Sequence, residues 1–242
     1  MDIIKRNFKA KECTLISIII LITIALPIIS YWSTGIELSK NISVLVNRQL
    51  IYQSSTFILA VVFLFVLWKL KTKEFVQYFK KGNIAATITP EPLVGIKPKN
   101  NENWWHLGMN FSVIITLVTM VVIYFQVIHG NNFDYSKLLF VLPISIGFSL
   151  VNSFVEESIT RLGIVIALKG IIHDKYIMIA SGILFGSVHY FGTPGGLVGV
   201  FVAGFLGWLL AKSILETKGF FWAWFIHFLQ DIVIITAMLA IE

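Results

Sequence analysis

Long apolar runs separated by short polar stretches make up most of the chain. Seven runs stand out, and most approach or exceed the roughly 20 residues that a helix needs to cross a bilayer. They cover residues 13–32, 51–68, 107–128, 138–168, 176–191, 196–211 and 219–241. The pattern predicts an all-α, polytopic transmembrane helical bundle with about seven spans, or eight, because helices satisfy their own backbone in lipid.

Composition indicates the same class of protein. Of the 242 residues, 57% are hydrophobic and 13% are charged, and the mean hydropathy is +0.83. A soluble domain would be about a quarter charged, which excludes an ordinary soluble globule, a disordered chain and a fibrous protein. We interpret residues 1–242 as a single multi-pass domain in the cell membrane, most simply a bacterial plasma membrane.

The chain has a formal charge of +6, and most of its Lys and Arg residues lie in loops on one side of the predicted bundle. A basic cluster at residues 5–11 precedes the first span, and the loops after the second, fourth and sixth spans carry most other lysines. The basic residues assigned to the opposite side are Lys40, Arg48 and Lys137. The positive-inside rule then predicts a cytoplasmic N-terminus. Membrane lipid, and not nucleic acid, is the expected partner of these charges.

The longest polar segment, residues 69–106, allows two interpretations. Its first part is an amphipathic helix lying on the inner leaflet, or the segment is a solvated cytoplasmic loop with an aromatic membrane anchor. The aromatic residues concerned are Phe75, Tyr78, Phe79, Trp104 and Trp105.

Small residues recur at every fourth position of the sixth run. They are Gly195, Gly199, Ala203, Gly207 and Ala211. This spacing places them on one helical face, where a neighbouring backbone can approach closely. We interpret the stripe as a packing feature.

Ionisable residues inside the runs are confined to three of them. They are Glu156, Glu157 and Arg161 in the fourth run, His189 in the fifth, and His227 and Asp231 in the seventh. A charged group at the centre of a bilayer costs roughly 2.5–3.5 kcal/mol on insertion scales. Any one of these residues alone is readily explained as structural, but their joint occurrence in apolar helices indicates a functional site.

Spacing along the fourth run divides the roles of its three charged residues. Glu157 and Arg161 are four residues apart, the arrangement that favours an ion pair on a helix. Glu156 then lacks that local counter-charge in a low-dielectric site, which suits a general base.

The two histidines lie at depths where they can meet Glu156. His227 and Asp231 share one face of the seventh run, and Phe185 and His189 share one face of the fifth. At about 1.5 Å per residue, all four titratable groups lie roughly 12–20 Å from the predicted cytoplasmic ends of their runs. We therefore expect a single site that opens toward the cytoplasmic half.

Three motifs carry a resemblance to a known family. Residues 156–161 read EExxxR, residues 185–189 read FxxxH, and residues 227–231 read HxxxD. Together they resemble the CAAX-prenyl endopeptidase and bacteriocin-processing family of intramembrane proteases, also called CPBP or Abi. The resemblance covers about residues 138–241, the expected catalytic core, whereas the first three runs match only in being hydrophobic.

The resemblance implies peptide-bond hydrolysis by an activated water. Carried over, Glu156 and His189 polarise the water, His227 and Asp231 stabilise the oxyanion, and the supporting residues are Glu157, Arg161 and Phe185. Eukaryotic and archaeal members usually have Asn in place of Asp231, and an ionised Asp cannot donate a hydrogen bond. Either Asp231 is neutral, or it orients His227, which then donates to the oxyanion.

The resemblance also raises the question of a metal, because the family is often called metalloproteases. The sequence has no HExxH zinc motif. Glu156, His189 and His227 nevertheless supply three ligands, the minimum for a catalytic zinc. We favour hydrolysis without a cofactor, with zinc as the alternative.

Several functions remain open at this level. Richness in Ile, Lys and Asn is typical of an AT-rich bacterial genome, which favours maturation of a membrane-associated peptide or bacteriocin self-immunity over processing of prenylated proteins. A non-enzymatic membrane immunity or binding protein would not need Glu156. A proton-coupled transporter also uses buried Glu, His and Asp, but the polar set is compact and the halves share no repeat.

Overall fold

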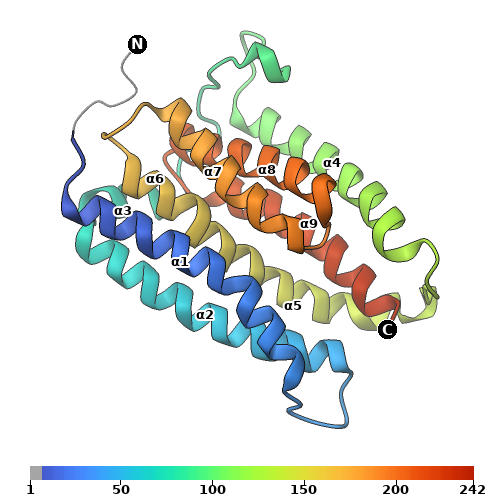
Figure 1. The fold of residues 1–242 in the computed structure, drawn as a ribbon. Helices are drawn as coiled ribbons and strands as arrows, with labels where there is room; N and C mark the ends of the chain where they lie inside the picture. Colours follow the sequence, from blue (N-terminus) through green and yellow to red (C-terminus); the bar gives the residue numbers. More distant parts are fainter. Residues whose placement is uncertain (1–6) are drawn as a thin grey trace.

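Helices make up 77% of the computed structural model, which describes residues 7–242 and contains no strand among them. Lys5 and Arg6 of the basic N-terminal cluster lie outside the described residues. The helices in Figure 1 are α1 (Ala10–Trp32), α2 (Val44–Leu70), α3 (Thr72–Tyr78), α4 (Trp104–Ile123), α5 (Leu138–Glu156), α6 (Gly163–Leu168), α7 (Asp174–Val188), α8 (Gly196–Thr217) and α9 (Phe221–Ala240). The predicted all-α class is confirmed.

Six helical stretches within residues 7–242 are long and apolar enough to cross a membrane. They are Ala10–Gly35, Val44–Leu70, Trp104–Ile128, Tyr135–Leu168, Gly196–Thr217 and Phe221–Ala240. The other predicted run, 176–191, forms the shorter helix α7 of 15 residues. At 1.5 Å per residue α7 rises only about 22 Å, less than the roughly 30 Å hydrocarbon core. The polytopic membrane class is confirmed, with α7 shorter than a complete crossing.

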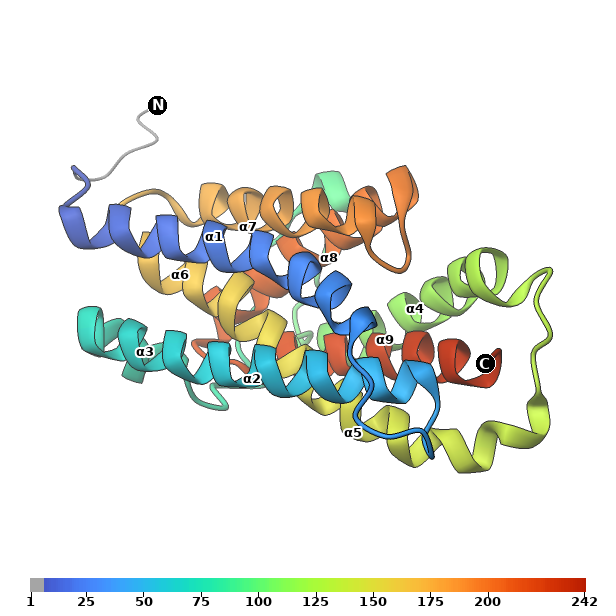
Figure 2. The ribbon, with the colours of Figure 1, turned by 60° about the horizontal axis from the view of Figure 1, so that its bottom comes forward.

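The long helices alternate in direction, so the loops gather at two ends of the bundle. Figure 2 shows α7 and α8 in one layer and α5 and α9 in the other, and these two pairs make the most extensive helix contacts. At one end Asn83, after α3, donates its backbone N–H to Thr217 at the end of α8. At the other end Glu242 accepts hydrogen bonds from Ser43 and Leu45 at the start of α2. The predicted basic loops share the first end; that this end is cytoplasmic stays a prediction.

The fourth run forms the central helix of the bundle. α5, a π-helical stretch (Glu157–Leu162) and α6 follow one another without a break. Every residue from 157 to 168 is buried, in contact with α1, α2, α8 and α9. A π-helical turn inserts an extra residue and often marks a functional site. Here it begins immediately after Glu156 and changes the direction in which the following side chains point.

Residues 69–106 close the basic end of the bundle and match neither interpretation in full. Between the end of α2 and the start of α4, the described residues form one α-helix, α3, with 7 residues. Tyr78 and Trp104 are buried in the protein, and the indole Nε1 of Trp104 donates to Glu216 Oε2 at 2.7 Å. Lys212 Nζ of α8 donates to the carbonyl oxygen of Thr89 at 2.8 Å. The segment is therefore held on α8 by hydrogen bonds of Asn83, Thr89 and Trp104.

Glycines bring α7 and α8 into close contact, as the small-residue stripe predicted. A Cβ on Gly186 of α7 would lie 2.6 Å from the carbonyl oxygen of Val200, and one on Gly207 of α8 would lie 3.0 Å from that of Ser181. The first separation is shorter than real Cβ atoms show, and the second would require the neighbouring backbone to shift by a few tenths of an ångström. The close approach fixes the end of α7, where His189 lies.

Candidate active site

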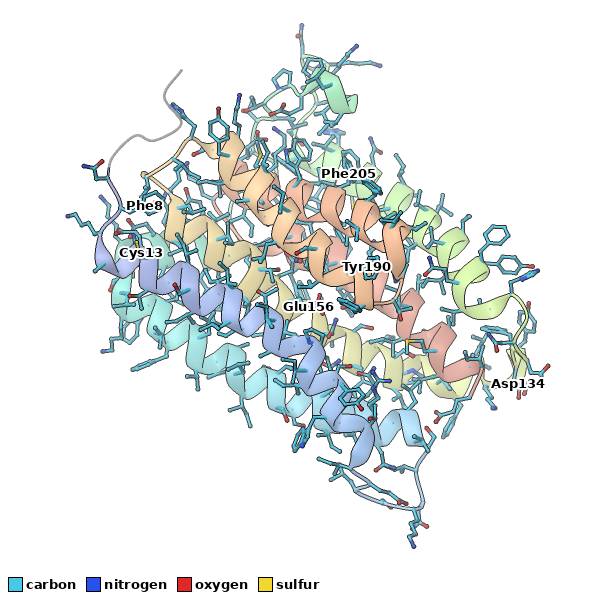
Figure 3. All side chains as sticks on the ribbon, in the orientation of Figure 1. Phe8, Cys13, Asp134, Glu156, Tyr190 and Phe205 are labelled. Carbon is cyan, nitrogen blue, oxygen red and sulfur yellow. The ribbon has the colours of Figure 1, made fainter. Side chains whose placement is uncertain are left out.

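The ionisable residues of the three runs come together in the middle of the bundle. Glu156 ends α5, His189 follows α7 directly, and His227 and Asp231 lie one turn apart on α9. Figure 3 shows Glu156 deep among the helices, far from either end. All four line one cavity of about 760 Å³. The convergence expected from the sequence is present in the structure.

Glu156 lines this cavity and has one carboxylate oxygen without a hydrogen bond to the described residues. Its side chain is only 14% exposed, and Oε1 accepts a hydrogen bond from Asn152 Nδ2 at 3.2 Å. Its Oε2 is buried and forms no hydrogen bond with the described residues, and it lies 3.7 Å from His227 Nε2. A carboxylate held at one oxygen and free at the other can accept a proton from a bound water.

The closest carboxylate to His227 is Glu157, whereas one of the two alternatives from the sequence had Asp231 orienting the ring. The ring nitrogen Nδ1 lies 2.7 Å from Glu157 Oε1, and because an ionised carboxylate only accepts, Nδ1 carries the proton. Nε2 faces the other two acids, at 3.5 Å from Asp231 Oδ1 and 3.7 Å from Glu156 Oε2. The contact with Glu157 therefore fixes the ring and directs Nε2 at the group expected to act as the base.

Arg161 is the cation of this buried cluster. Its side chain is 0% exposed, and its guanidinium nitrogen NH2 lies 3.1 Å from Glu157 Oε1, as the four-residue spacing predicted. The guanidinium carbon Cζ lies 3.4 Å from the centre of the Phe185 ring, a cation–π contact. One oxygen of Glu157 thus meets both Arg161 and His227, which ties the central helix to α9.

Asn152 joins the two acids that face the cavity. Its amide nitrogen donates to Glu156 Oε1 at 3.2 Å and to Asp231 Oδ2 at 3.1 Å. Its own oxygen accepts from Gln53 Nε2 of α2 at 3.4 Å. Asn152 was not among the residues predicted from the sequence, because its side chain is not ionisable. A polar side chain one helical turn before Glu156 was the available signal.

His189 has one ring nitrogen committed to the backbone. Nδ1 lies 2.9 Å from the carbonyl oxygen of Phe185, and a carbonyl only accepts, so Nδ1 carries a proton. The neutral ring then has its lone pair on Nε2. The rings of Phe185 and His189 lie 4.0 Å apart between centroids, and those of Phe185 and His227 lie 5.6 Å apart. The ring of Phe185 therefore packs against both imidazoles.

The arrangement does not fit a metal ligand set. Within residues 7–242 no three His, Cys, Asp or Glu side chains are placed to hold one metal ion. Glu156, His189 and His227 line a common cavity but do not form such a group. We derive no catalytic step through a metal.

The cavity opens toward the end of the bundle opposite the basic loops. Its wall includes Tyr31 at the end of α1, Arg48 near the start of α2, and residues 191–194 before α8. Tyr31 and Phe191 at this end are 81% and 82% exposed. The expectation of an opening toward the cytoplasmic half is therefore wrong for the predicted orientation. The reason is that residues 69–106 close the basic end.

Comparison with protein families matches residues 136–233 to the model described as type II CAAX prenyl endopeptidase Rce1-like. This range covers the central helix, α7, α8 and most of α9, and it includes every candidate site residue named above except Gln53 of α2. The comparison with curated proteins found no match, and neither did the comparison with solved structures.

Proposed function

We propose that Glu156 activates a water that cleaves a peptide bond of a membrane-associated substrate, and the match of residues 136–233 to the type II CAAX prenyl endopeptidase Rce1-like model supports this proposal. The family and the six apolar helical stretches make the protein a multi-pass membrane protein of a protease family. One observation carries the proposed mechanism. Glu156 lines the cavity, and its buried Oε2, 3.7 Å from His227 Nε2, forms no hydrogen bond with the described residues.

The reaction begins with proton transfer from the water. Oε2 of Glu156 takes one proton while the lone pair on Nε2 of His189 accepts a hydrogen bond from the same water. The hydroxide attacks the carbonyl carbon of the substrate, and the carbonyl π electrons move onto its oxygen. Glu156 then returns its proton to the departing amide nitrogen as the C–N bond breaks. Glu156 therefore acts as the base in the first step and as the acid in the last, and no proton has to leave the cavity.

The developing oxyanion needs a hydrogen-bond donor. His227 supplies one when Nε2 is protonated, because Glu157 already accepts from Nδ1 at 2.7 Å. Asp231, 3.5 Å from Nε2, favours that charged ring, and its Oδ2 accepts from Asn152. In this proposal Asp231 acts through His227, and Glu157 and Arg161 hold the ring in place.

The proposal also includes a biological role for the cleavage. We favour maturation of a membrane-associated peptide or bacteriocin self-immunity in a bacterial plasma membrane. The whole chain acts as one membrane domain, with the catalytic core at residues 138–241. No cofactor is required in this scheme.

The experiment uses the purified full chain in phosphatidylcholine vesicles with a mixture of internally quenched decapeptides, and mass spectrometry identifies the cleaved bonds. We expect Glu156→Gln to lower the cleavage rate by about 10²–10⁴-fold without a change in thermal unfolding. Glu37→Gln, on an exposed loop, is the matched control and should keep the parental rate.

Two other outcomes would overturn parts of the proposal. Equal cleavage by the parent and by Glu156→Gln would remove Glu156 from the reaction, and no cleavage by the parent would favour a binding protein. Loss of activity with a chelator, restored by zinc, would replace the metal-free scheme with a zinc site.

A further inference from the structure

The catalytic cavity has a second polar region at its open end. Ser30 of α1, Thr34 in the turn that follows α1, and Arg48 and Gln49 of α2 line it there. Arg48 is the single Lys or Arg among the described residues that line the cavity. Its guanidinium NH2 donates to the hydroxyl oxygen of Ser30 at 2.8 Å. No ion pair of Arg48 is present within residues 7–242.

An unpaired guanidinium facing a cavity is a specific recognition group. It carries five N–H donors in a planar fork that matches a carboxylate, and one donor is used by Ser30. Arg48 is half-buried, so a charge held there loses part of its hydration and gains from a negatively charged ligand. A lipid headgroup would meet an arginine on the outer surface of α2, whereas Arg48 faces the space that leads to Glu156.

The polar wall is continuous from Arg48 to the catalytic carboxylate. Gln49 accepts from Gln53 Nε2 at 3.1 Å, and the same nitrogen lies 3.4 Å from Asn152 Oδ1. Asn152 in turn holds Glu156. The five residues from Arg48 to Gln53 and the four from Asn152 to Glu156 give an axial separation of roughly 13 Å. An extended peptide covers that distance with about four residues.

We propose that Arg48 and Ser30 form a carboxylate-binding subsite that holds a negatively charged group of the substrate a few residues from the bond attacked at Glu156. The subsite rests on the proposed peptidase function, because it names the substrate class of the same cavity. The carboxylate belongs to an Asp or Glu side chain or to the free C-terminus of the peptide. The two sources present the same planar group to the guanidinium.

Binding to the inert Glu156→Gln chain in phosphatidylcholine vesicles tests the subsite separately from cleavage. The probes are amidated dansyl decapeptides of Leu and Ala with one Asp moved along the sequence, their Asn counterparts, and one peptide with a free C-terminal carboxylate. We expect one Asp position, or the free C-terminus, to lower Kd about tenfold, the effect of one charge-assisted hydrogen bond. A preference at an internal position identifies a side chain, and a preference for the free acid identifies the C-terminus.

Variants of Arg48 then decide whether the preference belongs to this residue. Adding Arg48→Gln should reduce the preference to less than about twofold, and Arg48→Lys should retain part of it, because the charge remains without the planar fork. Lys40→Gln, an exposed cation near the same end, should leave it unchanged. Thermal unfolding of each variant checks that the fold is intact.

Each remaining result counts for or against the proposal. No preference in the parent background, or the same preference with Arg48→Gln, overturns the subsite, including the case in which Arg48 binds only lipid headgroups. Cleavage of these peptides by the unmodified chain without a preference for acid refutes the subsite and leaves the peptidase function standing. A preference for acid in binding, without any cleavage by the unmodified chain, supports the subsite and refutes the peptidase function.

Discussion

Replacing Arg161 with Met tests how the buried charges stabilise the bundle. The guanidinium is fully buried, 3.1 Å from Glu157 Oε1 and against the ring of Phe185. Methionine keeps much of the apolar volume but removes the charge. Glu157 would then keep only the contact with His227 in an environment that water does not reach.

The expected loss of stability follows from these contacts. Removing one partner of a buried ion pair costs about 3–5 kcal/mol, because the other charge stays uncompensated. The cation–π contact with Phe185 contributes about 0.5–2 kcal/mol, which is not independent of the ion pair. We take about 4 kcal/mol for the whole change, and at roughly 2–4 °C per kcal/mol for a chain of this size the unfolding midpoint should fall by about 8–16 °C.

The assay is thermal unfolding in detergent micelles, followed by tryptophan fluorescence. The double variant Glu157→Gln with Arg161→Met removes both charges and should recover at least half of the loss. Lys169→Met breaks a partly exposed pair with Asp174 and should cost less than about 1 kcal/mol. A midpoint shift below about 3 °C for Arg161→Met, or a double variant less stable than Arg161→Met alone, would refute the reasoning.

Two further variants probe the groups that position the catalytic residues. Asn152→Leu removes the donor to Glu156 and Asp231. It should lower kcat about 10–100-fold with little change in KM. A kcat within twofold of the parent in the peptide assay would contradict a positioning role for Asn152. Gly186→Val places a side chain where a Cβ already lies 2.6 Å from the Val200 carbonyl oxygen, whereas Gly147 has open space around it. We expect Gly186→Val to lower both the unfolding midpoint and the cleavage rate and Gly147→Val to change neither, and equal behaviour of the pair would show that α7–α8 contact does not hold His189.

Local pattern was sufficient to predict most of the long helices and the ionisable residues that line the cavity. The apolar run at 138–168 coincides with α5 through α6, because length and hydropathy determine a buried membrane helix. Charged residues in such helices are costly enough that each one stands out. Glu156, His189, His227 and Asp231 were found in this way.

The pairing inside the site and the direction of the cavity required three-dimensional information. Glu157 contacts His227 across the bundle because the π-helical stretch (Glu157–Leu162) turns its side chain toward α9, and the sequence carries no signal for that stretch. Asn152 is uncharged, so it does not carry the large cost of membrane insertion that distinguishes the charged residues in the sequence. The cavity opens away from the basic loops because residues 69–106 pack on α8, and such long-range packing is invisible to a pattern along the chain.

The most direct test of the central claim compares Glu156→Gln, His189→Gln and the variant carrying both substitutions in the peptide-cleavage assay. Residues that act as a unit on one water are strongly non-additive, so removal of the second costs little once the first is gone. The account predicts residual rates for all three variants within about tenfold of one another, far below the parental rate. A double variant whose loss equals the product of the two single losses, or a fully active His189→Gln, would contradict a single hydrolytic site.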